Sequence, residues 1–356
     1  MNIKKILLII FAWFVFVLPA QAGELHDAAR LGDIAKARQL LEQGVDVNIS
    51  DYNQETPLHI AAIFGNTAVV RLLLEKGANV NARDDQGKTP LFGAARSHAG
   101  VVQVLLEKGA DVNAKGDEQT TPLHEATYYF RSMDISQLLI ENGADLNAGA
   151  GTRRGTPLHI AAAGGHVDMA SLLIHKGADV NAKSENQMTP LHSAVEGGNT
   201  GLVKLLIENG ADLNAMDNDL GTALHRAVIP GNLGMVKLLL DHGADVNAIN
   251  TYGQTPLLYA HKYNYADITT LLLEKGAKKN LGREYKPIPA FGIGIYELAA
   301  LFMLFALLLF VVVFVDILKS DFRGNNKIVW LLAVIFVPFI GAIAYFFIGR
   351  KQKIVR

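Results

Sequence analysis

A three-residue motif recurs along most of this chain and constrains its fold more than any other feature. Thr-Pro-Leu begins at Thr56, Thr89, Thr121, Thr156, Thr189 and Thr255, with the variant Thr-Ala-Leu at Thr222. The spacing stays close to 33 residues. Self-similarity at a fixed period of about 20–50 residues is the signature of a chain that stacks copies of one structural unit. We therefore expect an array of about eight units over residues 23–280.

Each unit carries its own signals for beginning and ending helices. Thr caps a first helix, and the Pro that follows fits the first turn, where no backbone donor is lost. A glycine after the second helix, as at Gly44 and Gly77, can adopt the left-handed conformation that ends it. One unit cannot bury its apolar faces alone, so neighbouring units supply the core. In the second unit these faces consist of Ala61, Ala62, Val69, Val70, Leu72, Leu73 and Leu74.

These motifs resemble the ankyrin repeat. Thr-Pro-Leu-His, Leu-Leu and Gly-Ala-Asp-Val-Asn-Ala all occur at the family's spacing over residues 23–280. The resemblance implies an all-α fold, an ankyrin-repeat solenoid of helix-turn-helix units joined by projecting β-hairpin loops. It also implies a protein that binds other proteins on its concave surface and is not an enzyme. We expect no catalytic residues, no cofactor and no metal.

Six histidines recur at the fourth position of the motif. A metal site needs ligands that converge on one point, whereas these residues are strung along the axis of the array. We expect each of them to form a hydrogen bond between adjacent units, as the family pattern implies. They are His26, His59, His124, His159, His192 and His225.

Departures from the repeat carry more information about function than the repeat itself, because stacking does not require them. The third unit lacks one residue, which we place in the turn at residues 97–99. The fourth unit has one extra residue near residues 128–131 and another in the loop at residues 149–155.

The residues at these irregular turns and at the loop tips are our candidates for partner binding. Aromatic residues and arginine are frequent anchors of protein interfaces. The alternative is that the aromatic side chains fold inward and fill space left by the irregular turns. The candidates are Tyr52, Ile63, Phe64, Arg96, Tyr128, Tyr129, Phe130, Arg131, Arg153 and Arg154.

The N-terminus has the pattern of a secretory signal peptide over residues 1–22. Lys4 and Lys5 precede an apolar stretch at residues 6–18, and Ala20-Gln21-Ala22 is a small-x-small cleavage site. The alternative is an uncleaved membrane anchor. The chain contains no cysteine, which excludes disulfides and thiolate chemistry.

The C-terminal part has the pattern of a transmembrane hairpin. Residues 298–315 are all apolar, residues 328–348 contain no charge, and each run is long enough to cross a bilayer. We therefore expect a linker at residues 281–295, a two-helix transmembrane domain at 296–350 and a basic tail at 351–356.

This C-terminal part resembles the N-terminal membrane hairpin of cardiolipin synthases and related phospholipase D proteins. The resemblance rests on residues 316–319, 325–330 and 337–342, and on Gly349-Arg350-Lys351. The catalytic motif of those enzymes, His-x-Lys-x-x-x-x-Asp, is absent from the chain. We therefore expect an anchor or a helix-packing module without lipid-synthesis activity.

The charge is unevenly distributed. Residues 23–277 contain 20 Lys and Arg against 30 Asp and Glu, which disfavours nucleic acid as a partner because phosphate binding needs a basic face. Basic residues gather beside the predicted membrane segments, at Lys278, Lys279, Arg283 and Lys286 and in the tail, where they can meet lipid headgroups.

The predicted topology contains a conflict. Two membrane helices leave the repeats and the tail on one side, and a signal peptide places that side outside the cytoplasm. The positive-inside rule favours the opposite orientation. We expect an inner-membrane protein whose repeats lie in the periplasm, with a cytoplasmic repeat domain as the alternative. Its expected role is a scaffold or adaptor; the alternatives are an inhibitor or immunity factor for an exported toxin, and a non-catalytic subunit of a membrane lipid-handling enzyme.

Overall fold

The computed structural model describes residues 18–129, 133–151, 155–218 and 221–279, together with Val315 and Ile317, with side chains from residue 23 onward. The chain divides into two compact parts, Met1–Glu284 and Tyr285–Arg356. The predicted transmembrane hairpin, its linker and the basic tail lie outside the described residues except for Val315 and Ile317, and so does most of the predicted signal peptide. Within the described part, no helix is both long enough and apolar enough to cross a membrane.

The first of these two compact parts is an array of helix pairs. Eight pairs follow one another within residues 18–279, and the two helices of each pair contact each other. The pairs are α2 (Leu18–Leu31) with α3 (Ile34–Glu42), α4 (Pro57–Ile63) with α5 (Thr67–Glu75), α6 (Pro90–Ala95) with α7 (Ala99–Glu107), α8 (Pro122–Tyr129) with α9 (Met133–Glu141), α10 (Pro157–Gly164) with α11 (Val167–His175), α12 (Pro190–Glu196) with α13 (Thr200–Glu208), α14 (Ala223–Val228) with α15 (Leu233–Asp241), and α16 (Pro256–Lys262) with α17 (Ala266–Glu274).

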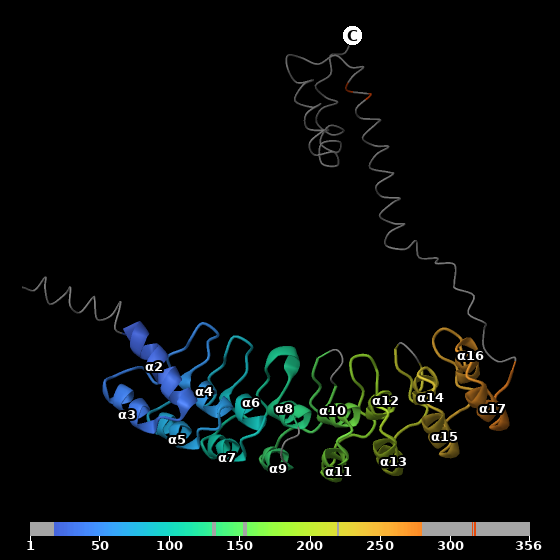
Figure 1. Ribbon diagram of the computed structural model, residues 1–356, viewed down its shortest axis with the longest axis horizontal. Helices are drawn as coiled ribbons and strands as arrows, with labels where there is room; N and C mark the ends of the chain where they lie inside the picture. The colour runs from blue at the N-terminus through green and yellow to red at the C-terminus, as the bar shows by residue number, and fades with distance from the viewer. Residues whose placement is uncertain are drawn as a thin grey trace, which may run out of the picture. The chain divides into compact units, whose positions relative to one another are not determined.

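The first helices of the pairs stand side by side in one row and the second helices form another row (Figure 1). The loops between pairs project from the first row. A short 3₁₀ turn at Asp117–Gln119 lies in one of these loops. The predicted all-α solenoid of helix-turn-helix units is therefore present.

The helices begin and end where the sequence patterns predict. Thr56 has an extended backbone, and Pro57 opens α4 behind it. The glycine that follows each second helix has a positive φ, for example +87° at Gly44 and +89° at Gly77. Residues with a side chain strongly disfavour this conformation, so each glycine ends its helix and turns the chain toward the next loop.

The core lies between the units. The leucine of each motif is 0 % exposed, from Leu58 to Leu224, and Ala61 and Ala62 are likewise fully covered. The alanines keep the first helices thin, so that those of neighbouring units approach closely. The stack therefore depends on contacts between units, as expected for a solenoid.

The projecting loops differ from the predicted β-hairpins. No strand occurs among the described residues, and the only β-bridge there pairs Ala150 with Gly155. The loop before α4 closes through the backbone hydrogen bonds Asp51 N to Glu55 O (3.0 Å) and Gln54 N to Asp51 O (3.1 Å), and the loop before α6 has the same pair. Arms this short leave no room for the successive pairs that define a ladder.

Neighbouring loops are tied to one another at their tips. Asp85 N donates to Asn53 O (2.9 Å), and Asp117 N donates to Gln86 O (2.8 Å). At the base of the loops, Asn81 accepts a hydrogen bond from Asp111 N (2.8 Å) in the next unit. Polar bonds thus fix the register of the loops, while the apolar core holds the helices.

Buried histidines join the units as the sequence predicts. Thr56 N donates to His59 Nδ1 (3.1 Å), so Nδ1 carries no proton and Nε2 must carry it. Nε2 then donates to Lys88 O (3.1 Å), the residue before the next motif. The corresponding bonds to the next unit recur at His26, His124, His159, His192 and His225.

The third unit lacks this bond because Phe92 occupies the histidine position. Phe92 is 1 % exposed, and Thr89 Oγ1 is buried with no hydrogen-bond partner among the described residues. The missing residue of this unit is taken up at the end of α6, which has six residues where α4 has seven. The turn after α6 contains no residue with positive φ, whereas the turn after α4 uses Gly65 at +74°.

Substituting the two threonines by valine should separate a used hydroxyl from an unused one. The Thr56 hydroxyl lies 2.9 Å from His59 Nδ1. Thr56→Val removes this hydroxyl hydrogen bond, keeps the one from Thr56 N, and should lower the free energy of unfolding by about 1 kcal/mol. Thr89→Val keeps the shape and removes an unpaired polar group, so stability should stay the same or rise by up to about 1 kcal/mol. Urea unfolding followed by far-UV circular dichroism measures both; equal losses would contradict this account of Thr89.

The buried histidines should make the repeats sensitive to mild acid. Burial is the first cause that lowers the pKa of His59, His159, His192 and His225, that of His192 to about 4. The folded state therefore binds fewer protons than the unfolded state once the pH falls below about 6.5, the usual pKa of histidine. The neutral histidines should make their full contribution to the free energy of unfolding above that pH. This contribution should decrease steadily as the pH falls toward 4.

The measurement is the urea midpoint between pH 7 and pH 5, above the usual range of carboxyl groups. His159→Gln, which cannot take up a proton, should reduce the slope of the midpoint against pH. A midpoint that does not change over this range would contradict the prediction.

Candidate partner-binding surface

A groove lies between the second and third units, where the projecting loops meet the first helices. Its volume is about 270 Å³. Ile63, Pro90 and Phe92 contribute apolar surface to it. Its charged residues are Glu55, Asp84, Asp85, Lys88 and Arg96.

Arg96, at one side of this groove, belongs to a cluster with two tyrosines and a buried carboxylate. Arg96 Nε donates to Glu125 Oε2 (3.1 Å), and its guanidinium lies 5.1 Å from the centre of the Tyr129 ring. Tyr128 meets Tyr129 edge to face, with ring centres 5.3 Å apart. Lys88 Nζ lies 4.0 Å from Glu125 Oε1. Glu125 thus holds both cations on this side of the groove.

The two tyrosines point outward. Tyr128 is 59 % exposed and Tyr129 is 41 % exposed, although both are large and partly apolar. The alternative of inward-folded aromatics therefore does not apply to this pair. A pair of exposed aromatic rings beside an arginine has the composition of an interface anchor.

The remaining candidates occupy several places in the units. Ile63 lines the groove and is half-buried, so the structure brings it together with Arg96. Phe64 lies in the turn after α4 and is 51 % exposed, and Tyr52 lies at a loop tip and is 91 % exposed. Phe130, Arg131, Arg153 and Arg154 lie outside the described residues.

The loop side of the groove is acidic. Glu55 belongs to the loop before α4, and Asp84 and Asp85 belong to the loop before α6. Burial, followed by the neighbouring Asp51 and Asp84, raises the pKa of the Glu55 carboxyl. Among the described residues, no cation lies within ion-pair distance of Glu55, Asp84 or Asp85.

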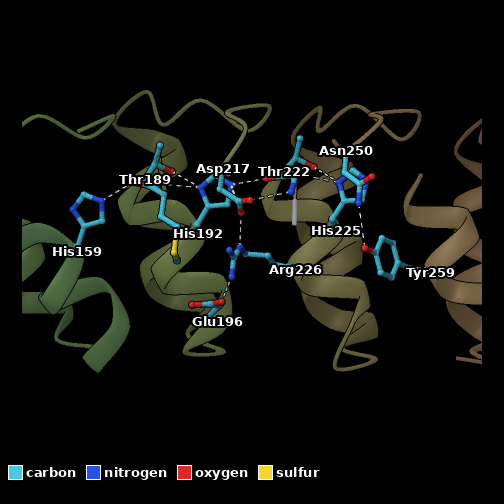
Figure 2. Close-up of polar contacts among 12 residues, drawn as sticks. His159, Thr189, His192, Glu196, Asp217, Thr222, His225, Arg226, Asn250 and Tyr259 are labelled. Atoms are coloured by element: carbon cyan, nitrogen blue, oxygen red, sulfur yellow. Dashed lines mark hydrogen bonds and ion pairs between the residues drawn. The ribbon is translucent and has the colours of Figure 1, made fainter. Parts of the chain in front are cut away.

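A second ionic cluster joins the sixth and seventh units, and sequence reasoning did not find it. Arg226 Nε donates to Asp217 Oδ2 (2.7 Å), Arg226 pairs with Glu196, and Gly221 N donates to Asp217 Oδ1 (3.0 Å). Figure 2 shows Arg226 between the two carboxylates, with His192 beside Asp217. Arg226 and Asp217 are almost fully buried, so this cluster is a structural link between units.

The two ionic clusters share one register. Arg96 and Glu196 each stand seven residues after the Thr of their motif, and Glu125 and Arg226 each stand four residues after the Thr of the next. The charges are reversed between the two clusters. Comparing these two positions across all units is the sequence signal that could have identified Arg226.

A group of tyrosines in the last unit was also missed. Tyr259 and Tyr263 are stacked with ring centres 6.3 Å apart, and Tyr263 lies 5.9 Å from Tyr265. Tyr259 is buried and accepts a hydrogen bond from Asn250 Nδ2 (3.1 Å), and burial is the first cause that raises its pKa (Figure 2). Four tyrosines within residues 252–265 were the available signal.

The histidines have no metal-binding geometry in the described part of the chain. No group of three or more His, Asp or Glu residues there is arranged to hold a metal ion. The six motif histidines instead each bond to the next unit.

The repeated helix pairs and the projecting loops define a repeat solenoid. Residues 25–116, 123–217 and 214–282 match the ankyrin-repeat family described as "Ankyrin repeats (3 copies)", and residues 94–140 match a second ankyrin description. The chain belongs to the ankyrin-repeat family. Residues 308–350 match the family "Phospholipase_D-nuclease N-terminal", which confirms the resemblance predicted for the C-terminal part.

Solved structures agree with this assignment. The chain is 33 % identical to the human ASB11 ankyrin repeat domain, with a TM-score of 0.56, over 61 % of this chain and 96 % of that one. No curated protein matches the sequence. Because 577 chains of solved structures match, the fold alone does not select a partner.

Proposed function

We propose that this protein is a membrane-anchored scaffold or adaptor that binds a partner protein on the surface of the second to fourth units. The observation that carries the proposal is the exposed cluster of Tyr128, Tyr129 and Arg96 beside the groove. Ankyrin repeats are typically non-catalytic and typically bind proteins. An N-terminal phospholipase D region is not itself a catalytic domain.

The cluster combines the features that make a good anchor. Tyrosine brings a large contact area at low cost in side-chain entropy. Arg96 is already held by Glu125 and Tyr129, so little of its freedom remains to be lost on binding. A partner ring or aliphatic side chain that covers this cluster would bury apolar area without stranding a charge.

The membrane part of the proposal rests on the C-terminal sequence. The apolar runs within residues 296–350 and the family match at 308–350 support an anchor, and the basic tail supports contact with lipid headgroups. We propose an inner-membrane location with the repeats in the periplasm. The alternative is a repeat domain on the cytoplasmic side.

A second candidate function follows from the same family match. The protein would be a non-catalytic subunit of a membrane lipid-handling enzyme, joined to it through residues 296–350. This candidate function predicts that the protein copurifies with a phospholipid-handling protein. The copurification should be lost when only this segment is replaced by an unrelated hairpin.

Replacing the exposed tyrosines should weaken partner binding and leave the fold intact. In the double variant Tyr128→Ala with Tyr129→Ala, we expect capture of the partner to fall at least about tenfold. Truncating an anchor residue commonly costs about 2 kcal/mol or more of binding free energy. The matched control is Tyr252→Ala with Tyr263→Ala, two exposed tyrosines of the last unit. The measurement is crosslinked capture from the native host, with circular dichroism to check folding. Loss in the control pair instead would move the site to the last unit.

The orientation of the repeats can be measured directly. We expect a reporter that matures only outside the cytoplasm to be active when it is fused after Asn280. A second reporter, active only inside, should be silent at the same position. The reverse result would exclude export and establish the cytoplasmic alternative.

A further inference from the structure

The groove between the second and third units is polarised. Its two cations, Lys88 and Arg96, lie toward Glu125 on the side of the fourth unit. Its carboxylates, Glu55, Asp84 and Asp85, belong to the loops and meet no cation among the described residues. The free protein therefore keeps negative charge together at one end of a recess. Burial first, and then the neighbouring carboxylates, raise the pKa of Glu55.

Most of the residues that line the groove are polar or charged, and the space is small. Ile63, Pro90 and Phe92 contribute its apolar side chains. A volume of about 270 Å³ is below the range of about 300–1,000 Å³ that is typical of small-molecule sites. The groove has room for one long side chain.

A polar group on its wall is also unsatisfied. Thr89 lines the groove, is 2 % exposed, and its hydroxyl has no partner in the described residues. Thr56, Thr121, Thr156, Thr189 and Thr222 each bond to the histidine of their motif, and the hydroxyl of Thr255 accepts a hydrogen bond from Leu258 N. The ring of Phe92 has no nitrogen to form the hydrogen bond that a histidine forms. A donor that enters the groove could therefore bond to the Thr89 hydroxyl.

We propose that this groove binds a cationic side chain, arginine or lysine, carried by an extended basic segment of the partner protein. The inference rests on the proposed function and names the chemistry of the partner. An aliphatic stem packs against Ile63 while the charged head reaches the carboxylates of the loops. Charge-assisted hydrogen bonds to carboxylates are stronger than neutral ones, and the carboxylates of Glu55 and Asp84 belong to half-buried residues.

The surroundings agree with a basic segment. The repeats carry ten more acidic than basic residues over positions 23–277, with 30 against 20. Such a field draws a basic segment toward the array, and the groove then fixes its register. Arg96 does not compete for the carboxylates, because Glu125 and Tyr129 hold it on the opposite side.

The test uses a hexaarginine peptide with one fluorophore as probe. Its binding to the full-length protein in neutral detergent is followed by fluorescence anisotropy at about 0.15 M ionic strength. Glu55→Gln with Asp85→Asn should weaken binding at least about tenfold, as expected for lost charged hydrogen bonds. The matched control, Glu118→Gln with Glu185→Gln, makes the same change in net charge in a different recess and should weaken binding less than about threefold.

Equal weakening in the two variants, or no binding by the wild-type protein, would overturn the proposal. Circular dichroism of both variants checks that they are folded. Capture of the natural partner by the Tyr128→Ala, Tyr129→Ala variant is measured in parallel. If capture falls there while hexaarginine shows no preference for the groove, the inference fails and the proposed function stands.

Discussion

The stack of units depends on one buried interaction, the neutral histidine that bridges from its own motif to the backbone of the next unit. A threonine N–H makes Nδ1 the acceptor, and this obliges Nε2 to donate to a carbonyl one unit further on. The bond has a preferred direction and length, so it fixes the spacing and register of the units that it joins. Apolar burial between the units supplies the stabilising energy but does not have this directionality.

The array departs from this arrangement where its surface is most distinctive. With Phe92 in place of the histidine, the third unit makes no such bond to the fourth, and the ion pair of Arg96 with Glu125 links these units on the groove side. The same substitution brings an aromatic wall to the groove and leaves Thr89 unpaired. At this junction the ion pair is not accompanied by a buried histidine bond, whereas the sixth and seventh units have both.

Much of the fold follows from the sequence because its determinants are local. Helix ends, the left-handed glycines and the bridging histidines depend on residues a few positions apart, and the repetition confirms each of them several times. The ionic pair of Arg226 with Asp217 and Glu196 was not predicted, because it depends on which side chains of adjacent units face each other. The outward direction of Tyr128 and Tyr129 and the absence of strands in the described loops depend likewise on packing and on the length of the loop arms.

The two ionic clusters have a consequence for how such a chain can change during evolution. Arg96 lies at the end of the first helix of its unit, and the next unit supplies Glu125. Glu196 lies at the end of the first helix of its unit, and the next unit supplies Arg226. Recombination that placed the Glu125 unit directly after the Glu196 unit would bring the nearly buried Glu125 carboxylate next to that of Glu196, with no arginine between them. The units therefore share a backbone but are not interchangeable, because these charges are complementary only in the present order of the units.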